Sequence, residues 1–182
     1  MRADINGWLS GVRRIPSPNY DQRPPATPID LLVIHNISLP PDEFGGTGIE
    51  KFFTNRLDTE AHPYYAQLKG VKVSSHFLIR RDGGIVQFVP CRQRAWHAGV
   101  SSWQGRMRCN DFSIGIELEG SDSVPFTDRQ YTALARLTRL LQRVYPIRSI
   151  AGHSDIAPVR KTDPGPYFDW PRYRATLKLK SC

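Results

Sequence analysis

The chain has 182 residues, of which 40% are hydrophobic and 23% charged, as is typical of a folded globular protein. A chain of this length can bury one sizeable core, so we expect one domain. The formal net charge of +8 favours an anionic partner, either a nucleic acid or a small poly-anionic substrate. The basic residues are scattered and form no dense basic helix, which argues against nucleic acid.

No segment of the sequence suggests a membrane or a secretion signal. The longest apolar run covers only residues 31–34, and residues 1–20 contain no apolar stretch of the secretory type. We therefore expect a cytoplasmic protein. The three cysteines, Cys91, Cys109 and Cys182, are widely spaced and predict reduced thiols rather than a disulfide framework or a thiolate zinc site.

The N-terminal part predicts an arm followed by a buried strand. Residues 1–28 contain five prolines, so we expect an extended arm that belongs to the same domain as residues 29–182. Residues 29–36 are mostly apolar and predict a strand buried on both faces, which ends in His35 and Asn36. Polar groups at the end of such a strand commonly face a site, although His35 could instead be a satisfied core histidine.

A helix and an irregular segment are predicted next. Thr47 and Glu50 have the spacing of a capping box, which predicts a helix over residues 48–57. Residues 58–70 are polar and predict an irregular loop, with His62 on the surface.

Two β-rich runs, 71–79 and 85–89, are joined by Arg-Asp-Gly-Gly and predict a hairpin. His76 lies in the first run and could pack in the core or bind a ligand. The loop that follows, 90–105, holds Trp96 beside His97. An indole ring can form the wall of a sugar or peptide site, and core packing is the equal alternative.

Residues 113–120 alternate apolar and polar positions, which places Glu117 and Glu119 on one face of a strand. A carboxylate at a strand centre needs a cation or a metal nearby; a solvated face or an internal ion pair would also explain the pattern. Thr127 and Gln130 predict a capped helix that continues to residue 144. Together these elements predict an α/β fold, with helices packed on a central mixed sheet.

A stiff polar loop over residues 152–166 carries most of the remaining chemistry. Its three prolines restrict the backbone around His153, Asp155, Lys161 and Asp163. A catalytic zinc ion commonly takes three protein ligands, and His35, His153 and one of the two aspartates could supply them. The residues alone do not choose between Asp155 and Asp163, and a solvated turn is the alternative.

Five motifs resemble one family over most of the chain. They are LVIHNISLPP (32–41), FGG (44–46), RAWHAGVS (94–101), CNDFSIGIELEG (109–120) and GHSDIAPVRKTDPG (152–165). They look like the type 2 N-acetylmuramoyl-L-alanine amidases, which are related to peptidoglycan recognition proteins, and in particular like the cytoplasmic members. One departure is Ser154, where we expect cysteine or another small residue.

The resemblance implies a single-domain α/β zinc amidase that cuts the amide between 1,6-anhydro-N-acetylmuramic acid and L-alanine in cell-wall recycling. It implies zinc ligation by His35, His153 and Asp163, and acid/base roles for Glu117 and Lys161. It also implies substrate contacts from Asn36, Trp96, His97 and Arg108, and leaves Asp155 a structural role.

The expected partner is a small anionic muropeptide, bound by a monomer without nucleic acid or membrane. Three rival interpretations stay open at this point. The chain could be an amidase that acts on polymeric peptidoglycan, a muropeptide-binding module without catalysis, or, on charge alone, a nucleic-acid-binding domain.

Overall fold

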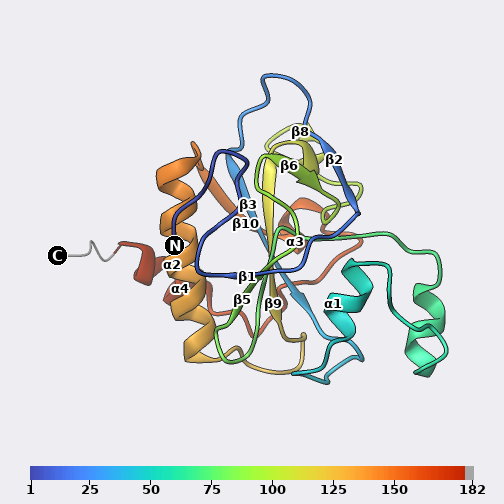
Figure 1. Ribbon diagram of the computed structural model, residues 1–182. Coiled ribbons are helices and arrows are strands. Elements are labelled where there is room, and N and C mark those ends of the chain that lie inside the picture. The colour runs from blue at the N-terminus through green and yellow to red at the C-terminus, as the bar shows by residue number, and fades with distance from the viewer. Residues whose placement is uncertain (179–182) are drawn as a thin grey trace.

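The computed structural model, described here for residues 1–178, contains a six-stranded mixed sheet with helices on both faces (Figure 1). In spatial order the strands are β1 (Arg13–Arg14), β5 (Ile85–Gln87), β4 (Phe77–Ile79), β9 (Ser113–Glu119), β3 (Leu31–Ile37) and β10 (Ser149–Gly152). Only the β4–β5 hairpin is antiparallel; every other neighbouring pair in this sheet is parallel. The predicted α/β class with a central mixed sheet is confirmed.

The remaining elements are short or lie outside this sheet. Two small antiparallel ladders join β2 (Tyr20–Gln22) to β6 (Gln93–Ala95) and β7 (Ser102–Trp103) to β8 (Arg106–Met107). The helices are α1 (Gly48–Phe53), η1 (Pro63–Leu68), η2 (Cys109–Asp111), α2 (Asp128–Val144), α3 (His153–Ile156) and α4 (Trp170–Lys178). None of the helices in residues 1–178 combines the length and the apolar character needed to cross a bilayer.

Helices α2 and α4 cover one face of the sheet (Figure 1). The predicted capping box starts α2, since Thr127 and Gln130 exchange side-chain and backbone hydrogen bonds. Alternate residues of the central strands, such as Ile114 and Ile116, pack against Leu134 on this helix in the main apolar core. This layer supports the sheet from one side and leaves the opposite face free to carry polar side chains.

The opposite face carries two separate apolar clusters with a polar gap between them. One cluster packs Phe52 and Phe53 of α1 against Leu78 of β4. The other packs Val33 of β3 against Ile156 of α3. Because the central strands β3 and β9 place their polar side chains on this face, those side chains are left between the clusters.

The N-terminal arm is tied to the sheet at several points. β1 pairs with β5, and β2 pairs with β6. The partly buried Arg23 guanidinium donates hydrogen bonds to the carbonyl groups of Cys91, Asn110 and Ser113. Residues before 29 therefore fix the loops that follow β5 and precede β9.

Three local expectations were wrong. Thr47 makes no side-chain cap at α1, which ends at Phe53, because Glu50 is instead held by the guanidinium groups of Arg13 and Arg80. Residues 71–76 form no strand, because this segment makes its hydrogen bonds to loops rather than to a neighbouring strand, as Ser74 does. Residues 58–70 are not wholly irregular, because they contain η1.

Candidate metal centre and cavity

The register of three parallel strands brings the predicted ligands to one end of the sheet. His35 of β3 lies opposite Glu117 of β9, and Gly152 of β10 lies opposite Ile34. His153 follows β10 directly, so it emerges beside His35. The carboxyl ends of parallel strands share one edge of a sheet, which is where α/β proteins commonly place a site.

His35, His153 and Asp163 present three ligand atoms to one another. The two Nδ1 atoms lie 3.0 Å apart, and Oδ2 of Asp163 lies 2.9 Å from that of His35 and 3.1 Å from that of His153. Ligand atoms around a tetrahedral zinc ion lie about 3.3 Å apart. Two imidazoles and one carboxylate are a donor set that fits zinc and leaves a fourth position open.

Asp155 is excluded from this group by its own hydrogen bond. Its carboxylate accepts from the backbone N–H of Gly152 at 2.7 Å and so closes the first turn of α3. Of the two aspartates that the sequence allowed, only Asp163 reaches the histidines. Within residues 1–178, His35, His153 and Asp163 are the one cluster of this type that could hold a metal ion.

The electrostatics of the cluster favour metal-binding protonation states. Burial lowers the pKa of His35 to about 4, although the hydrogen bond and the charge of Asp163 act against this. Burial opposes ionisation of Asp163, but its close contacts with His153 and His35 outweigh the effect of burial and lower the pKa of that carboxyl. At neutral pH the site therefore offers a neutral imidazole and a carboxylate.

Glu117 lies in the same cavity, and the pKa of its carboxyl is shifted upwards, in the opposite direction to that of Asp163. Burial raises the pKa of its carboxyl well above the ordinary value, the Asp163 carboxylate raises it further, and the Lys161 ammonium opposes both. A carboxyl group that titrates closer to neutrality is suited to accepting and returning a proton. Strongly shifted groups in a cavity are characteristic of functional sites.

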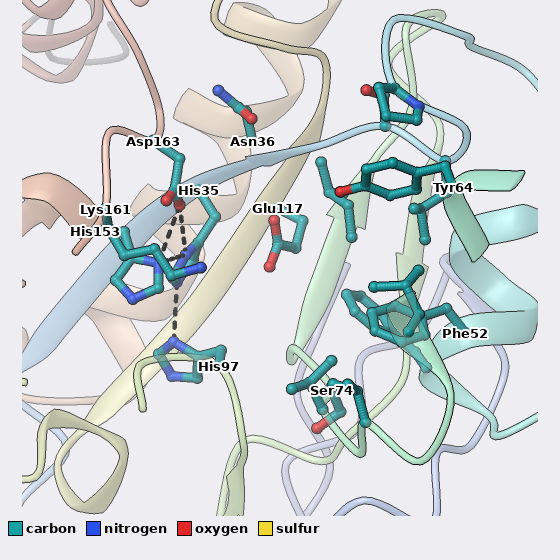
Figure 2. A pocket seen from close by; sticks show the side chains of 18 residues that line it. His35, Asn36, Phe52, Tyr64, Ser74, His97, Glu117, His153, Lys161 and Asp163 are labelled. Carbon is teal, nitrogen blue, oxygen red and sulfur yellow. Dashed lines mark hydrogen bonds and ion pairs between the residues drawn. The ribbon is translucent and has the colours of Figure 1, made fainter. Parts of the chain in front are cut away.

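The cluster lies in a cavity of about 410 Å³ with two unlike walls (Figure 2). One wall is polar and carries the three candidate ligands with Glu117 and Lys161. The other wall is largely apolar, and its side chains include Phe52, Tyr64, Leu68 and Val71. Such a cavity suits a ligand with a polar reacting group and an apolar face.

Seven of the nine predicted site residues line this cavity, and Trp96 and Arg108 do not. Trp96 adjoins it, since its backbone N–H donates to the hydroxyl of the cavity residue Ser74. The Arg108 side chain is 70% exposed and pairs with Asp111. Asn36 lines the cavity, while its amide group donates to Asp122 and to the Pro164 carbonyl. The substrate contacts expected of these residues stay predictions.

The sequence did not indicate the apolar wall. Tyr64 belongs to η1, a turn of helix that begins at Pro63 after the capping residue His62. Proline in the first helical position was the available signal. Phe52 lies on the buried side of α1, and nothing in the local sequence shows which buried face borders a cavity.

Two other polar residues are structural. Glu119 pairs with Arg80 and also accepts a hydrogen bond from Gly45 N–H at 2.7 Å, so the ion pair that the sequence allowed is present here. It thereby ties the 38–48 loop to the sheet. His76 is fully buried and accepts from Gly115 N–H, which confirms core packing rather than a ligand role.

Residues 25–166 match the family described as N-acetylmuramoyl-L-alanine amidase, and the chain belongs to this family. Over 177 residues it is 61% identical to the 1,6-anhydro-N-acetylmuramyl-L-alanine amidase AmpD of Escherichia coli (strain K12), covering 96% of this chain and 97% of that protein. A crystal structure of an AmpD selenomethionine derivative matches with a TM-score of 0.94 at 59% identity, covering 97% of this chain and 99% of the other.

A more distant relative has been solved with a ligand. The E. coli amidase AmiD, in complex with the substrate anhydro-N-acetylmuramic acid-L-Ala-D-gamma-Glu-L-Lys, matches with a TM-score of 0.60 at 35% identity. The match covers 85% of this chain and 60% of AmiD. These similarities confirm the family and the fold that the motifs predicted.

Proposed function

We propose that this chain is a zinc-dependent amidase that hydrolyses the amide between 1,6-anhydro-N-acetylmuramic acid and L-alanine in anhydromuropeptides, as a step of cell-wall recycling. The observation that carries the proposal is the convergence of His35, His153 and Asp163 in a cavity that also holds Glu117 and Lys161. Family membership supports it, as do relatives named for this activity and the ligand of the AmiD complex.

The side chains divide the chemistry between them. Zinc held by His35, His153 and Asp163 would supply Lewis-acid polarisation and lower the pKa of a water molecule to about 7. Glu117 takes a proton from the attacking water and passes one to the L-alanine nitrogen as the carbon–nitrogen bond breaks. Lys161 donates to the oxyanion that develops on the scissile carbonyl oxygen. The products are the muramic acid carboxylate and the free amine of the peptide.

The cavity and the charge of the chain suit an anionic muropeptide. The apolar wall with Tyr64 can cover a sugar or peptide face, while a net charge of +8 attracts the carboxylates of the peptide stem. In this proposal Arg108 binds one such carboxylate, and Asn36 and Trp96 contact the substrate near the scissile bond. We place the reaction in the cytoplasm, as the family resemblance implies, and assign it to a monomer.

The test compares three substrates with the purified chain: an anhydromuramyl tripeptide, the same peptide on reducing-end muramic acid, and polymeric peptidoglycan. We expect fastest release of peptide from the anhydro substrate, loss of activity with a chelator and recovery with zinc. Faster cleavage of the polymer would favour a cell-wall amidase. Zinc-independent binding of the muropeptide without hydrolysis would favour a binding module. Salt-sensitive binding of nucleic acid would instead favour a nucleic-acid-binding domain.

A further inference from the structure

The outer nitrogens of both candidate histidine ligands contact two consecutive residues. Nε2 of His153 lies 3.1 Å from the carbonyl oxygen of Ala98, and Nε2 of His35 lies 3.0 Å from Nδ1 of His97. A metal-binding histidine is oriented, and its tautomer fixed, by the hydrogen bond that its other nitrogen makes. The segment His97–Ala98 therefore occupies the position from which both ligands can be controlled.

The proton positions follow from groups that can only accept. A carbonyl oxygen accepts, so the Ala98 contact requires a proton on Nε2 of His153 and leaves its Nδ1 as a lone pair. The hydroxyl of Ser113 gives its single proton to the Cys109 carbonyl oxygen at 2.6 Å. The same hydroxyl must then accept from Nε2 of His97, which lies 3.2 Å away.

The series of hydrogen bonds continues from His97 to His35. Neutral His97 carries one ring proton, and once that proton is on Nε2 its Nδ1 can only accept. Nε2 of His35 must donate to it, and Nδ1 of His35 is left as a lone pair. The lone pairs of His35, His153 and Asp163 then face one another at 2.9–3.1 Å, an arrangement that a cation stabilises.

Neighbouring residues accommodate the His97 ring and fix the backbone of His97 and Ala98. Gly115 lies in the middle of β9, where glycine is unfavourable, and a Cβ atom there would lie 2.5 Å from Cγ of His97. The missing side chain is the space that the His97 ring fills. The side-chain oxygen of Asn110 accepts from the backbone N–H groups of both His97 and Ala98, at 3.1 and 2.8 Å. Strand β9 and helix η2 thus hold the segment in place.

We propose that His97–Ala98 is the positioning element of the metal centre and that His97 acts through His35 rather than on the substrate. Both ring nitrogens of His97 are already engaged, one by a ligand and one by Ser113. This replaces the substrate contact that the resemblance implied for His97. The inference rests on the proposed zinc site and adds to it the reason why both imidazoles present Nδ1.

The test measures zinc affinity by competition with a chromophoric chelator, in the wild-type chain and in variants. His97→Phe keeps a buried ring without the acceptor and should weaken zinc binding about 10–100-fold. His97→Asn places an acceptor oxygen where Nδ1 was and should recover most of the affinity. Gly115→Ala should weaken binding by displacing the ring. His62→Phe is the matched control, since His62 lies outside the site, and should bind zinc as wild type does.

A second readout addresses the tautomers directly. In ¹⁵N-histidine spectra of the zinc-loaded wild-type chain, His35 and His153 should each carry their proton on Nε2. A proton on Nδ1 of His35, or unchanged zinc affinity in a folded His97→Phe chain, would overturn the inference while leaving the zinc site intact. If the wild-type chain itself bound no zinc, the proposed function would fall and this inference with it. The spectra decide the matter even if a variant does not fold.

Discussion

His35 and Glu117 are direct register partners on the adjacent parallel strands β3 and β9. Their side chains leave the same face of the sheet at the same level, so a metal ligand and a carboxyl group enter one cavity side by side (Figure 2). Backbone hydrogen bonding of two central strands fixes this relationship, and rigid elements hold catalytic groups more accurately than loops do. The chemistry of each partner can be tested separately.

Asp163→Ala should abolish both zinc retention and amidase activity. The variant removes the carboxylate that reaches both histidines, at 2.9 and 3.1 Å. Zinc content after gel filtration and hydrolysis of an anhydromuropeptide are the measurements. Asp155→Ala is the matched control and should keep its zinc, because that carboxylate only caps α3. An active, metal-free Asp163→Ala chain would contradict the ligand assignment.

Glu117→Gln should retain zinc and lose at least about a hundredfold in turnover, the usual scale of general acid/base catalysis. Glutamine keeps the size of the side chain but cannot take a proton from water. Rates at saturating substrate and zinc content are the two measurements. Near wild-type turnover would move the proton-transfer role to another group.

Lys161→Met should likewise retain zinc, because Lys161 is not in the ligand cluster. Methionine keeps the length of the side chain without its charge, so the developing oxyanion loses a donor. Removal of one such donor typically lowers kcat about 10²–10³-fold. A fall confined to KM, with kcat unchanged, would instead indicate ground-state substrate binding.

The raised pKa of Glu117 predicts a pH-dependent cost to the metal-free fold. Below the ordinary pKa of 4.5 the carboxyl is protonated in both folded and unfolded chains. As pH rises towards the higher folded-state pKa, only the unfolded chain ionises, and the free energy of unfolding decreases. Metal-free Glu117→Gln should therefore match wild type near pH 4 and exceed it at neutral pH. Urea unfolding at both pH values measures this, and an equal difference at the two values would contradict it.

Glu119→Gln should lower stability rather than act on chemistry directly. Its buried carboxylate accepts from the Arg80 guanidinium, from Gly45 N–H and from Arg81 N–H. Loss of a hydrogen bond to a charged group costs about 1.5–3 kcal/mol. Urea unfolding should show a loss of that size, whereas Glu43→Gln, a change at an exposed residue in the same loop, should stay within about 0.5 kcal/mol of wild type.

Local sequence determined much of the scaffold and the residue types of the site. Alternation in residues 113–119 correctly placed Glu117 and Glu119 on one face, and Thr127 with Gln130 correctly marked the start of α2. Such signals are readable because strand period and helix capping depend on residues a few positions apart. The same reasoning failed at Thr47, because the Glu50 side chain pairs with Arg13 and Arg80, which are distant in the sequence, instead of completing a capping box.

Tertiary structure decided which of these residues act together. Asp163 rather than Asp155 joins the histidines, Tyr64 enters the cavity wall, and His97 contacts His35. Each of these outcomes depends on strand register and loop packing between residues far apart in the chain, including the 118 positions that separate His35 from His153. The sequence by itself determined the central strands, helix α2 and the family motifs, because these depend on residues close together in the chain; the packing of β3, β9 and β10 determined the site.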